Sequence, residues 1–426
     1  MSDSPSPAPE PAPEPAPDTS TRALLRERDF MLFWIERFIS TLGVQIQSVA
    51  LGWQVYAIAR LTHSVGESAF LVSMIGLAQF LPLLALTLTA GETADRHTRK
   101  IIVAVSLAVD SVSASVLLVL ALSGSHILWP IFAVSVMFGA SRAFLSPASS
   151  ALGPMLVPRA LLPRAIAWNS LAWQSASIIG PAIGGLLLIH SPALAFGTAL
   201  GFYLLAALMA LAIRKNTKPE TQPGSRLALI QEGLAYVWNN KIVFGSISLD
   251  LFAVILGGAT ALLPVFAKDV LHIGPAGFGI LRASPAIGAT LVGVYLAAVP
   301  IRRHAGRIMF AGVAMFGVAT VVFGLSKLLW LSVGSLAVLG GADMLSVYVR
   351  QTLVQIVTPD AMRGRVAAVS GVFISASNEL GEAESGVAAW LLGPVGAVVF
   401  GGLGAIGVTG LWAWLFPDLR KADRLN

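Results

Sequence analysis

Twelve long apolar runs limit this chain to one class of structure. Each run is long enough to cross a bilayer as a helix, which takes about 20 apolar residues. They cover residues 30–59, 69–91, 101–123, 127–150, 163–189, 193–213, 241–267, 275–300, 306–326, 329–357, 366–391 and 393–416. Of the 426 residues, 56% are hydrophobic and only 12% are charged, whereas about 25% are charged in an ordinary soluble protein. We therefore predict an all-α membrane protein with twelve transmembrane helices.

The positions of Lys and Arg predict the topology. Of the 28 Lys and Arg residues, 21 fall in segments on the same side of the membrane as both termini, 3 on the other side and 4 within the apolar runs. Because cytoplasmic loops are enriched in basic residues, both termini are expected in the cytoplasm, with the chain in the cytoplasmic (inner) membrane of a bacterium. The net charge of +6 then reflects these loops and not a nucleic-acid partner.

The same pattern divides the chain into parts. The N-terminal segment is rich in Pro and Ala and lacks the apolar core of a signal peptide, so we expect it to be disordered. A polar stretch separates two groups of six runs, and its apolar spacing predicts an amphipathic helix on the membrane surface. The predicted parts are a cytoplasmic tail 1–28, a six-helix bundle 29–213, a cytoplasmic linker 214–240, a second six-helix bundle 241–417 and a cytoplasmic tail 418–426.

The two groups of six runs contain matching loops. Pro158 to Arg164 matches Pro359 to Arg365 at an offset of 201, and Arg96-His-Thr-Arg-Lys-Ile101 matches Arg303-His-Ala-Gly-Arg-Ile308 at an offset of 207. Such a repeat predicts two pseudo-symmetric bundles related by an axis along the membrane normal, with a cavity between them.

Two motifs carry a resemblance to a known family. The loop Gly91-Glu-Thr-Ala-Asp95-Arg96-His-Thr-Arg99-Lys100 resembles the motif between the second and third helices of the major facilitator superfamily, although threonines replace its hydrophobic and second glycine positions. Gly180-Pro181-Ala-Ile-Gly184-Gly185 resembles the motif of that superfamily's antiporters. The resemblance covers residues 28–420 and implies a twelve-helix fold that works by alternating access. The residues it assigns to gating are Gly91, Asp95, Arg96, Arg99, Gly180, Pro181 and Gly184.

Three further segments narrow the resemblance. Ser141-Arg142-Ala143-Phe144, Arg350-Gln351 and Ser377-Asn-Glu-Leu-Gly-Glu382 resemble the subfamily that contains the enterobactin exporter and macrolide-efflux-like proteins. This likeness implies proton-coupled export of a siderophore-like or drug-like molecule. Solute–proton symport for uptake could use the same residues and stays open as an alternative.

Charged residues inside the apolar runs indicate where transport could be coupled to protons. A charge within the membrane costs free energy, so such residues often have a function. Glu379 and Glu382 are three residues apart and share a helix face, so both cannot ionise easily in a low dielectric. A structural ion pair between helices is the competing interpretation, and we favour it for Asp110 and Glu384. The residues assigned to proton coupling are Glu379, Glu382, Asp343, Asp250, Arg142 and Arg350.

Uncharged polar and aromatic residues in the runs are candidates for contact with a small-molecule substrate. They are Gln45, Gln174, Asn169, Asn378 and Trp173. We expect the other partners to be protons and the lipid bilayer, and we expect a monomer.

The main rival class is a membrane-embedded enzyme. The six histidines form no His-x-x-x-His pair, and the sequence contains no Gly-x-Ser-x-Gly, no cysteine and no Gly-Lys dipeptide of an ATP-binding loop. We therefore expect no catalytic residue, no metal and no cofactor, with the proton gradient as the source of energy.

Overall fold

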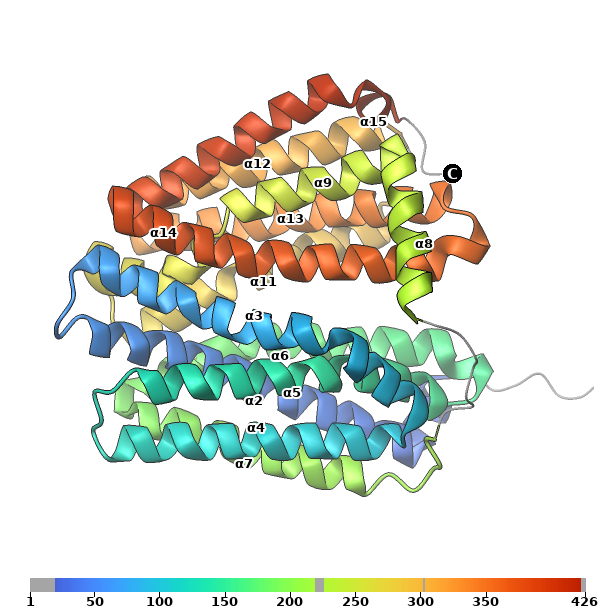
Figure 1. Cartoon of the computed structure of the whole chain (residues 1–426), viewed down its shortest axis with the longest axis horizontal. Coiled ribbons are helices and arrows are strands. Elements are labelled where there is room, and N and C mark those ends of the chain that lie inside the picture. The colour runs from blue at the N-terminus through green and yellow to red at the C-terminus, as the bar shows by residue number, and fades with distance from the viewer. Residues whose placement is uncertain (1–19, 219–225, 302, 423–426) are drawn as a thin grey trace, which may run out of the picture.

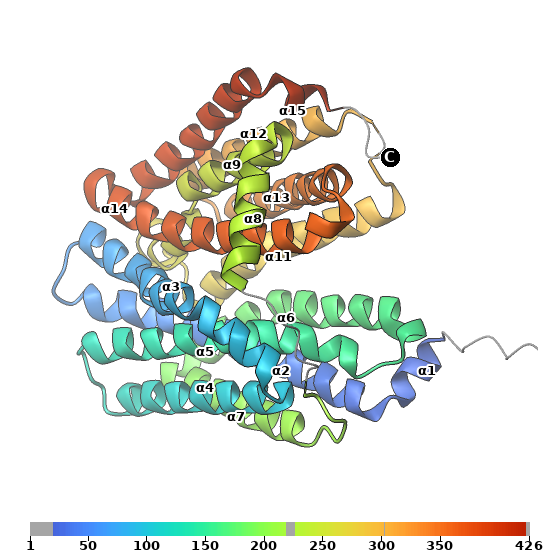
Figure 2. The same cartoon turned by 45° about the vertical axis from the view of Figure 1, so that its right-hand side comes forward.

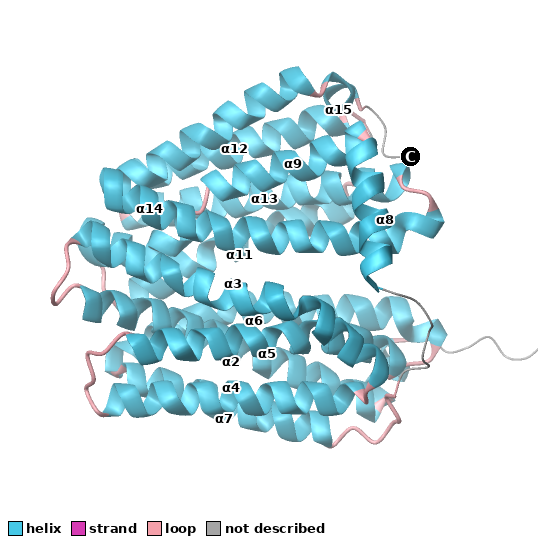
Figure 3. Cartoon of the chain, viewed as in Figure 1, coloured by secondary structure: helices cyan, strands magenta, loops and turns pink. Residues whose placement is uncertain are grey.

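The computed structural model describes residues 20–218, 226–301 and 303–422. Within these ranges the chain forms helices and turns and no strand (Figure 3). The helices are α1 (Thr21–Arg26), α2 (Arg28–Ala59), α3 (Val65–Arg96), α4 (Arg99–Leu122), α5 (Trp129–Met155), η1 (Arg159–Leu161), α6 (Leu162–His190), α7 (Pro192–Leu211), α8 (Arg226–Asn239), α9 (Lys241–Leu256), η2 (Ala259–Leu262), α10 (Leu263–Val265), η3 (Phe266–Val270), α11 (Pro275–Ala298), α12 (Ala305–Leu325), α13 (Leu329–Val357), α14 (Asp360–Leu415) and α15 (Pro417–Lys421).

The long helices form two bundles, so the predicted fold class is confirmed. In the N-terminal bundle α2 to α7 pack together, through the pairs α4 with α7, α3 with α5 and α2 with α6. In the C-terminal bundle α9 to α14 pack together, through α11 with α13 and α12 with α13 and α14. Figure 1 shows the first bundle below the second. The bundles meet along two seams, α3 with α14 and α6 with α11.

The number of membrane-spanning segments depends on how α2 and α14 are counted. Ten described helices are long and apolar enough to cross a membrane, judged by length and composition. α2 is not among these ten, although it is 32 residues long. α14 is counted as one of the ten. However, Gly393 has non-helical backbone angles and is followed by Pro394, and this break divides α14 into the two predicted runs 366–391 and 393–416. With α2 counted and α14 divided, the twelve predicted spans all correspond to helices.

The two ends of the molecule are easily told apart. The short helix α15 and the connecting helix α8 lie at the right-hand end in Figure 1, and α1 lies on the same side in Figure 2; we call this the terminal end. The turns at 60–64 and 123–128 and the break at Gly393 lie at the other, which we call the far end (Figure 1).

Two segments predicted as tails are partly helical instead. Ser20 caps α1 through a hydrogen bond from the Ala23 N–H to its hydroxyl (3.2 Å), and Leu24 is fully buried. Leu419 of α15 is likewise fully buried, and the Gly306 N–H donates to the Ala422 carbonyl. The prediction of disorder is therefore wrong for 20–28, because this segment has a leucine that it can bury, and the predicted C-terminal tail begins with a short helix. Residues 1–19 and 423–426 lie outside the described ranges.

The connector between the bundles contains the helix that the sequence predicts. α8 runs across the ends of the other helices (Figure 1) and packs against α14 and α9. The Tyr236 hydroxyl donates to the Val357 carbonyl (3.0 Å), Val237 is buried, and Arg365 forms an ion pair with Glu232. Residues 219–225 lie outside the described ranges.

Candidate functional site

Glu379 and Glu382 of α14 lie against Gly76 of α3, where the two bundles meet. A β-carbon at Gly76 would lie 2.6 Å from Oε2 of Glu382 and 2.9 Å from Oε2 of Glu379. A methyl group at this position would therefore require the ends of both glutamate side chains to move. The structure thus places the predicted pair on one helix face and in contact with the opposite bundle. Gly76 was not predicted, since nothing marks it out within the apolar run 69–91.

Two arginines complete this cluster. Arg142 of α5 and Arg282 of α11 both interact electrostatically with both glutamates. Arg282 also donates from Nη1 to the Thr260 carbonyl (3.2 Å). Each bundle therefore contributes one arginine to the pair of carboxylates. Arg142 was predicted as a partner of the glutamates, whereas Arg282 was not. Its position inside the apolar run 275–300 could have identified it, because a charge within the membrane is costly.

A small cavity adjoins the cluster on its far-end side. It holds about 50 Å³ and is lined by residues of both bundles, among them Ser48, Thr260, Phe278, Arg282 and Glu382. That volume accommodates one or more water molecules, each of which needs at least about 10–15 Å³. A drug-sized ligand needs a pocket of roughly 300–1,000 Å³. The cavity can therefore hydrate Glu382 and Arg282 but cannot hold an organic solute.

Asp250, Asp343 and Arg350 form a second cluster, inside the C-terminal bundle. Nη2 of Arg350 lies 3.2 Å from Oδ2 of Asp250, and both side chains are almost fully buried. Asp343 interacts electrostatically with both and lies seven residues before Arg350, on the same face of α13. The sequence grouped these residues with Glu379 and Glu382. In the structure, the Asp250–Arg350 ion pair lies within one bundle, whereas the two glutamates contact the other bundle at Gly76.

The N-terminal bundle has a polar contact at the equivalent place. Nη1 of Arg37 donates to the Ser149 hydroxyl (2.7 Å) and joins α2 to α5. Ser149 precedes Arg350 by 201 residues, which is the repeat offset of the sequence. Both bundles therefore tie their first and fourth helices together through an arginine, but only the C-terminal bundle uses an ion pair.

The predicted substrate residues are not gathered in one place. Asn378 is exposed and lies beside Glu379 in the chain, and Gln45 packs against Gly180. The Gln174 amide donates to the Ala286 carbonyl (3.2 Å) and to the Thr290 hydroxyl of α11, so Gln174 is part of the contact between bundles. Among the described residues, no hydrogen bond joins any of the five to the glutamates.

The last two predicted substrate residues lie on α6. Asn169 is half-buried, and Trp173 is 51% exposed.

The predicted gating loop is held within the N-terminal bundle. Nη1 of Arg99 donates to the Ala151 carbonyl of α5 (3.1 Å), and Arg96 forms an exposed ion pair with Glu92 (2.6 Å). Gly91 is buried, and Asp95 is half-buried near the end of α3. These contacts fix the α3–α4 turn against α5.

The predicted glycine motif of α6 faces two neighbours. A β-carbon at Gly180 would lie 2.6 Å from Cβ of Gln45 in α2, and one at Gly184 would lie 3.2 Å from Cα of Ile46. Across the seam, the Pro181 carbonyl oxygen lies 2.6 Å from the place of a β-carbon on Gly279. The small residues thus let α6 approach both its own bundle and α11 of the other.

A polar cluster closes the far end between α2 and the segment after α9. The Tyr56 hydroxyl donates to the Asp269 carboxylate, and Nη2 of Arg60 lies 3.6 Å from Oδ1 of the same residue. The Lys268 ammonium lies 5.9 Å from the centre of the Tyr56 ring. Asp269 lies in η3, a π-helical turn, a rare geometry found often at functional sites. This far-end cluster was not predicted.

The contacts between bundles run from the far end to the middle of the helices. Along the α3–α14 seam they start where a β-carbon at Gly66 would lie 3.2 Å from Cα of Trp390, and they continue through Ser73 against Gly386 to Gly76. Arg142 and Asn378 lie near the middle of their helices and are exposed. The bundles are therefore closed at the far end, and the glutamates lie at the inner limit of the closed seam.

Comparisons with known proteins agree with this architecture. A sequence profile of the family MFS_3, described as transmembrane secretion effector, matches residues 19–423. Enterobactin exporter EntS of Citrobacter koseri is 26% identical over 383 residues, covering 88% of this chain and 85% of that protein. Enterobactin exporter EntS of Escherichia coli O139:H28 is 27% identical over the same length and coverage.

Solved structures share the fold at low identity. A POT family transporter in complex with a thioalcohol conjugated peptide superposes with a TM-score of 0.73 at 12% identity, covering 92% of this chain and 96% of that chain. A bacterial homologue of the iron transporter ferroportin in its inward-facing state gives a TM-score of 0.67 at 16% identity, covering 93% and 99%.

Proposed function

Since the chain belongs to the transmembrane secretion effector family, we propose that it exports a small organic molecule in exchange for protons. Membership confirms the resemblance inferred from the sequence and makes the protein a multi-pass membrane transporter. Two relatives of this chain are named enterobactin exporters. A siderophore-like or drug-like solute is therefore the proposed cargo, and export the proposed direction.

The observation that carries proton coupling is the position of Glu379 and Glu382. They belong to one bundle, press against Gly76 of the other, and lie near an arginine of each. Neutralising one carboxylate would weaken its attraction to Arg142 across the seam and also remove the repulsion between the two acids. The charge on this pair thus acts directly on the contact that must open and close.

We place the terminal end in the cytoplasm, following the distribution of Lys and Arg. The described conformation then faces inward, with the seam closed toward the outside. The cavity beside Glu382 lies on the outer side of the pair, where protons would arrive through water. Moving one charge through the membrane potential yields roughly 2.3 kcal/mol per 100 mV. Inverting a two-state equilibrium from 1:99 to 99:1 takes about 5.5 kcal/mol, so one charge moved through 100 mV supplies roughly two-fifths of that amount, and the pH gradient adds to it.

Everted membrane vesicles test the proposal. An imposed proton gradient, inside acidic, should drive accumulation of a solute from a panel of siderophores and drugs, and each transported solute should be accompanied by proton efflux. The variant Glu379→Gln/Glu382→Gln should lose gradient-driven accumulation at normal expression. Glu384→Gln, on the same helix, is the matched control and should retain it. Gradient-driven transport that survives in the double variant would refute the coupling role, and movement of solute in the same direction as protons would refute export.

A further inference from the structure

A hollow at the terminal end of the N-terminal bundle gathers basic side chains. It is an open depression of about 590 Å³, lined by residues of the α1–α2 junction, by Leu156 and by the segment that follows α7. The charged residues that line it are Arg26, Glu27, Arg28, Asp29, Arg214 and Lys215. Four cations against two carboxylates leave a net charge of two positive, so the hollow favours an anion.

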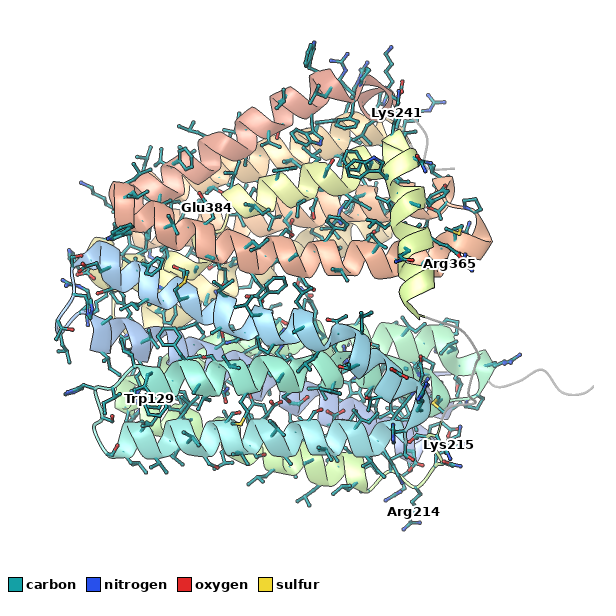
Figure 4. All side chains as sticks on the ribbon, viewed as in Figure 1. Trp129, Arg214, Lys215, Lys241, Arg365 and Glu384 are labelled. Carbon is teal, nitrogen blue, oxygen red and sulfur yellow. The ribbon has the colours of Figure 1, made fainter. Side chains whose placement is uncertain are left out.

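Asp29 holds the segments that line this hollow together, and its carboxylate is already occupied by hydrogen bonds within the protein. Its carboxylate accepts hydrogen bonds from the Lys215 N–H (2.8 Å) and the Arg214 N–H (3.3 Å), and from Nη1 of Arg28 (3.1 Å). Of the two acids, Asp29 is therefore already neutralised by the protein. The Arg214 and Lys215 side chains are exposed and lie beyond the helix ends (Figure 4).

An apolar stripe on α7 ends three residues before Arg214, one of the residues that line the hollow. Leu204, Leu208 and Leu211 are 50%, 62% and 57% exposed. Their spacing of four and three residues places them on one face of the helix, and Arg214 follows three residues after the last. A surface that is apolar along the membrane-spanning helix and basic at its end matches a phospholipid, with the acyl chain along the stripe and the headgroup in the hollow.

We propose that this hollow is a binding site for a phosphate ester, the headgroup of an anionic phospholipid whose acyl chain lies along the α7 stripe. Basic pockets at the cytoplasmic ends of transmembrane helices bind such headgroups. The leaflet, the cytoplasmic one, follows from the orientation given under the proposed function. The site lies within one bundle and is independent of the glutamate cluster.

The purified full-length chain in neutral detergent tests the site. Dioleoylphosphatidylglycerol, dioleoylphosphatidylcholine and inorganic phosphate are titrated separately, with the midpoint of thermal unfolding as the readout. Each titration uses the wild type, Arg214→Ala/Lys215→Ala and the control Arg420→Ala/Lys421→Ala. The control removes the same two charges from the terminal end of the other bundle and leaves the hollow intact. Both variants keep the backbone N–H groups.

The expected result is saturable stabilisation by phosphatidylglycerol and not by phosphatidylcholine. The apparent affinity should fall roughly 30-fold in the hollow variant, the effect of losing two basic contacts, and stay within about twofold in the control. Stabilisation by inorganic phosphate with the same sensitivity would support the phosphate site but identify a free anion as its ligand. Equal losses in both variants would show a general surface-charge effect and overturn the proposal, as would the same affinity in all three proteins.

Discussion

Tyr56 and Asp269 are hydrogen-bonded to each other across the two bundles, at the far end of the molecule. Arg60 lies 3.6 Å from the same carboxylate, so one acidic residue of the C-terminal bundle has two partners, Tyr56 on α2 and Arg60 directly after it. A transporter that alternates between two openings must break these contacts whenever the far end opens. The far-end cluster therefore contributes to the stability of the conformation described here.

Tyr56→Phe should shift the equilibrium toward opening at the far end. A hydrogen bond to a charged group contributes about 1.5–3 kcal/mol, so the open population should rise roughly tenfold or more. Since the chain has no cysteine, Ser48→Cys, which lines the small cavity, can report access. A membrane-impermeant maleimide applied from the far side should label this cysteine roughly tenfold faster when Tyr56 is also changed. Tyr295→Phe, an exposed position on α11, should leave the rate unchanged, and equal rates in all backgrounds would contradict a gating role.

Gly76→Ala should impair transport without impairing folding. The added methyl group would lie 2.6 and 2.9 Å from the two glutamate oxygens, so both carboxylates must move from their positions beside Gly76. We expect gradient-driven transport to fall roughly tenfold or more, although alanine favours a helix over glycine by about 1 kcal/mol. Gly201→Ala is the matched control, because a β-carbon there meets nothing within 4 Å. Normal flux in Gly76→Ala at normal expression would count against the seam as the coupling point.

The helices and the two bundles could be predicted because a bilayer imposes length and hydropathy on every spanning segment. The acidic pair on α14 could be predicted for a related reason, since ionisable residues within the membrane are costly and seldom incidental. α1 and α15 escaped this reasoning because each depends on the burial of one leucine, Leu24 or Leu419, which no periodic pattern reveals.

The sequence could not show which buried acidic residues pair with which arginines, because this depends on how the helices pack. Asp250 and Glu382 look alike in the sequence, since each is an acid within an apolar run. Only packing shows that the first pairs with Arg350 inside one bundle and the second faces Gly76 of the other. The bond between Tyr56 and Asp269 likewise depends on the docking of the bundles.

Asp29 gives a pH dependence that can be tested outside the membrane-spanning segments. Burial raises the pKa of its carboxyl, but hydrogen bonds from the Lys215 and Arg214 N–H groups and the charges of Arg28 and Arg214 lower it, and the net pKa is below the usual 3.8. The stabilisation is then fully present above about pH 3.8 and is lost as the pH falls through the lower, folded-state value.

Asp29→Asn should therefore lower the midpoint of thermal unfolding of the purified protein at pH 7. The expected decrease is about 2–4 °C, the size associated with the loss of one or two hydrogen bonds. The difference between wild type and variant should be constant between pH 5 and 8 and should shrink only in strong acid. A difference that disappears between pH 5 and 7 would contradict the lowered pKa.

Arg350→Gln should destabilise the protein more than Asp250→Asn. Removing the arginine leaves Asp250 and Asp343 buried together without a cation, and breaking a buried ion pair in this way costs about 3–5 kcal/mol. Removing Asp250 still leaves Asp343 near Arg350, so the remaining charge keeps a partner and the loss should be smaller. Thermal unfolding of the purified variants measures this order, and Arg37→Gln, at the equivalent contact with Ser149 in the other bundle, provides a comparison without an ion pair. A larger loss of stability in Asp250→Asn would contradict this account of the buried charges. If both variants unfolded like the wild type while losing proton-driven transport, the cluster would belong to the coupling machinery, as the sequence first indicated.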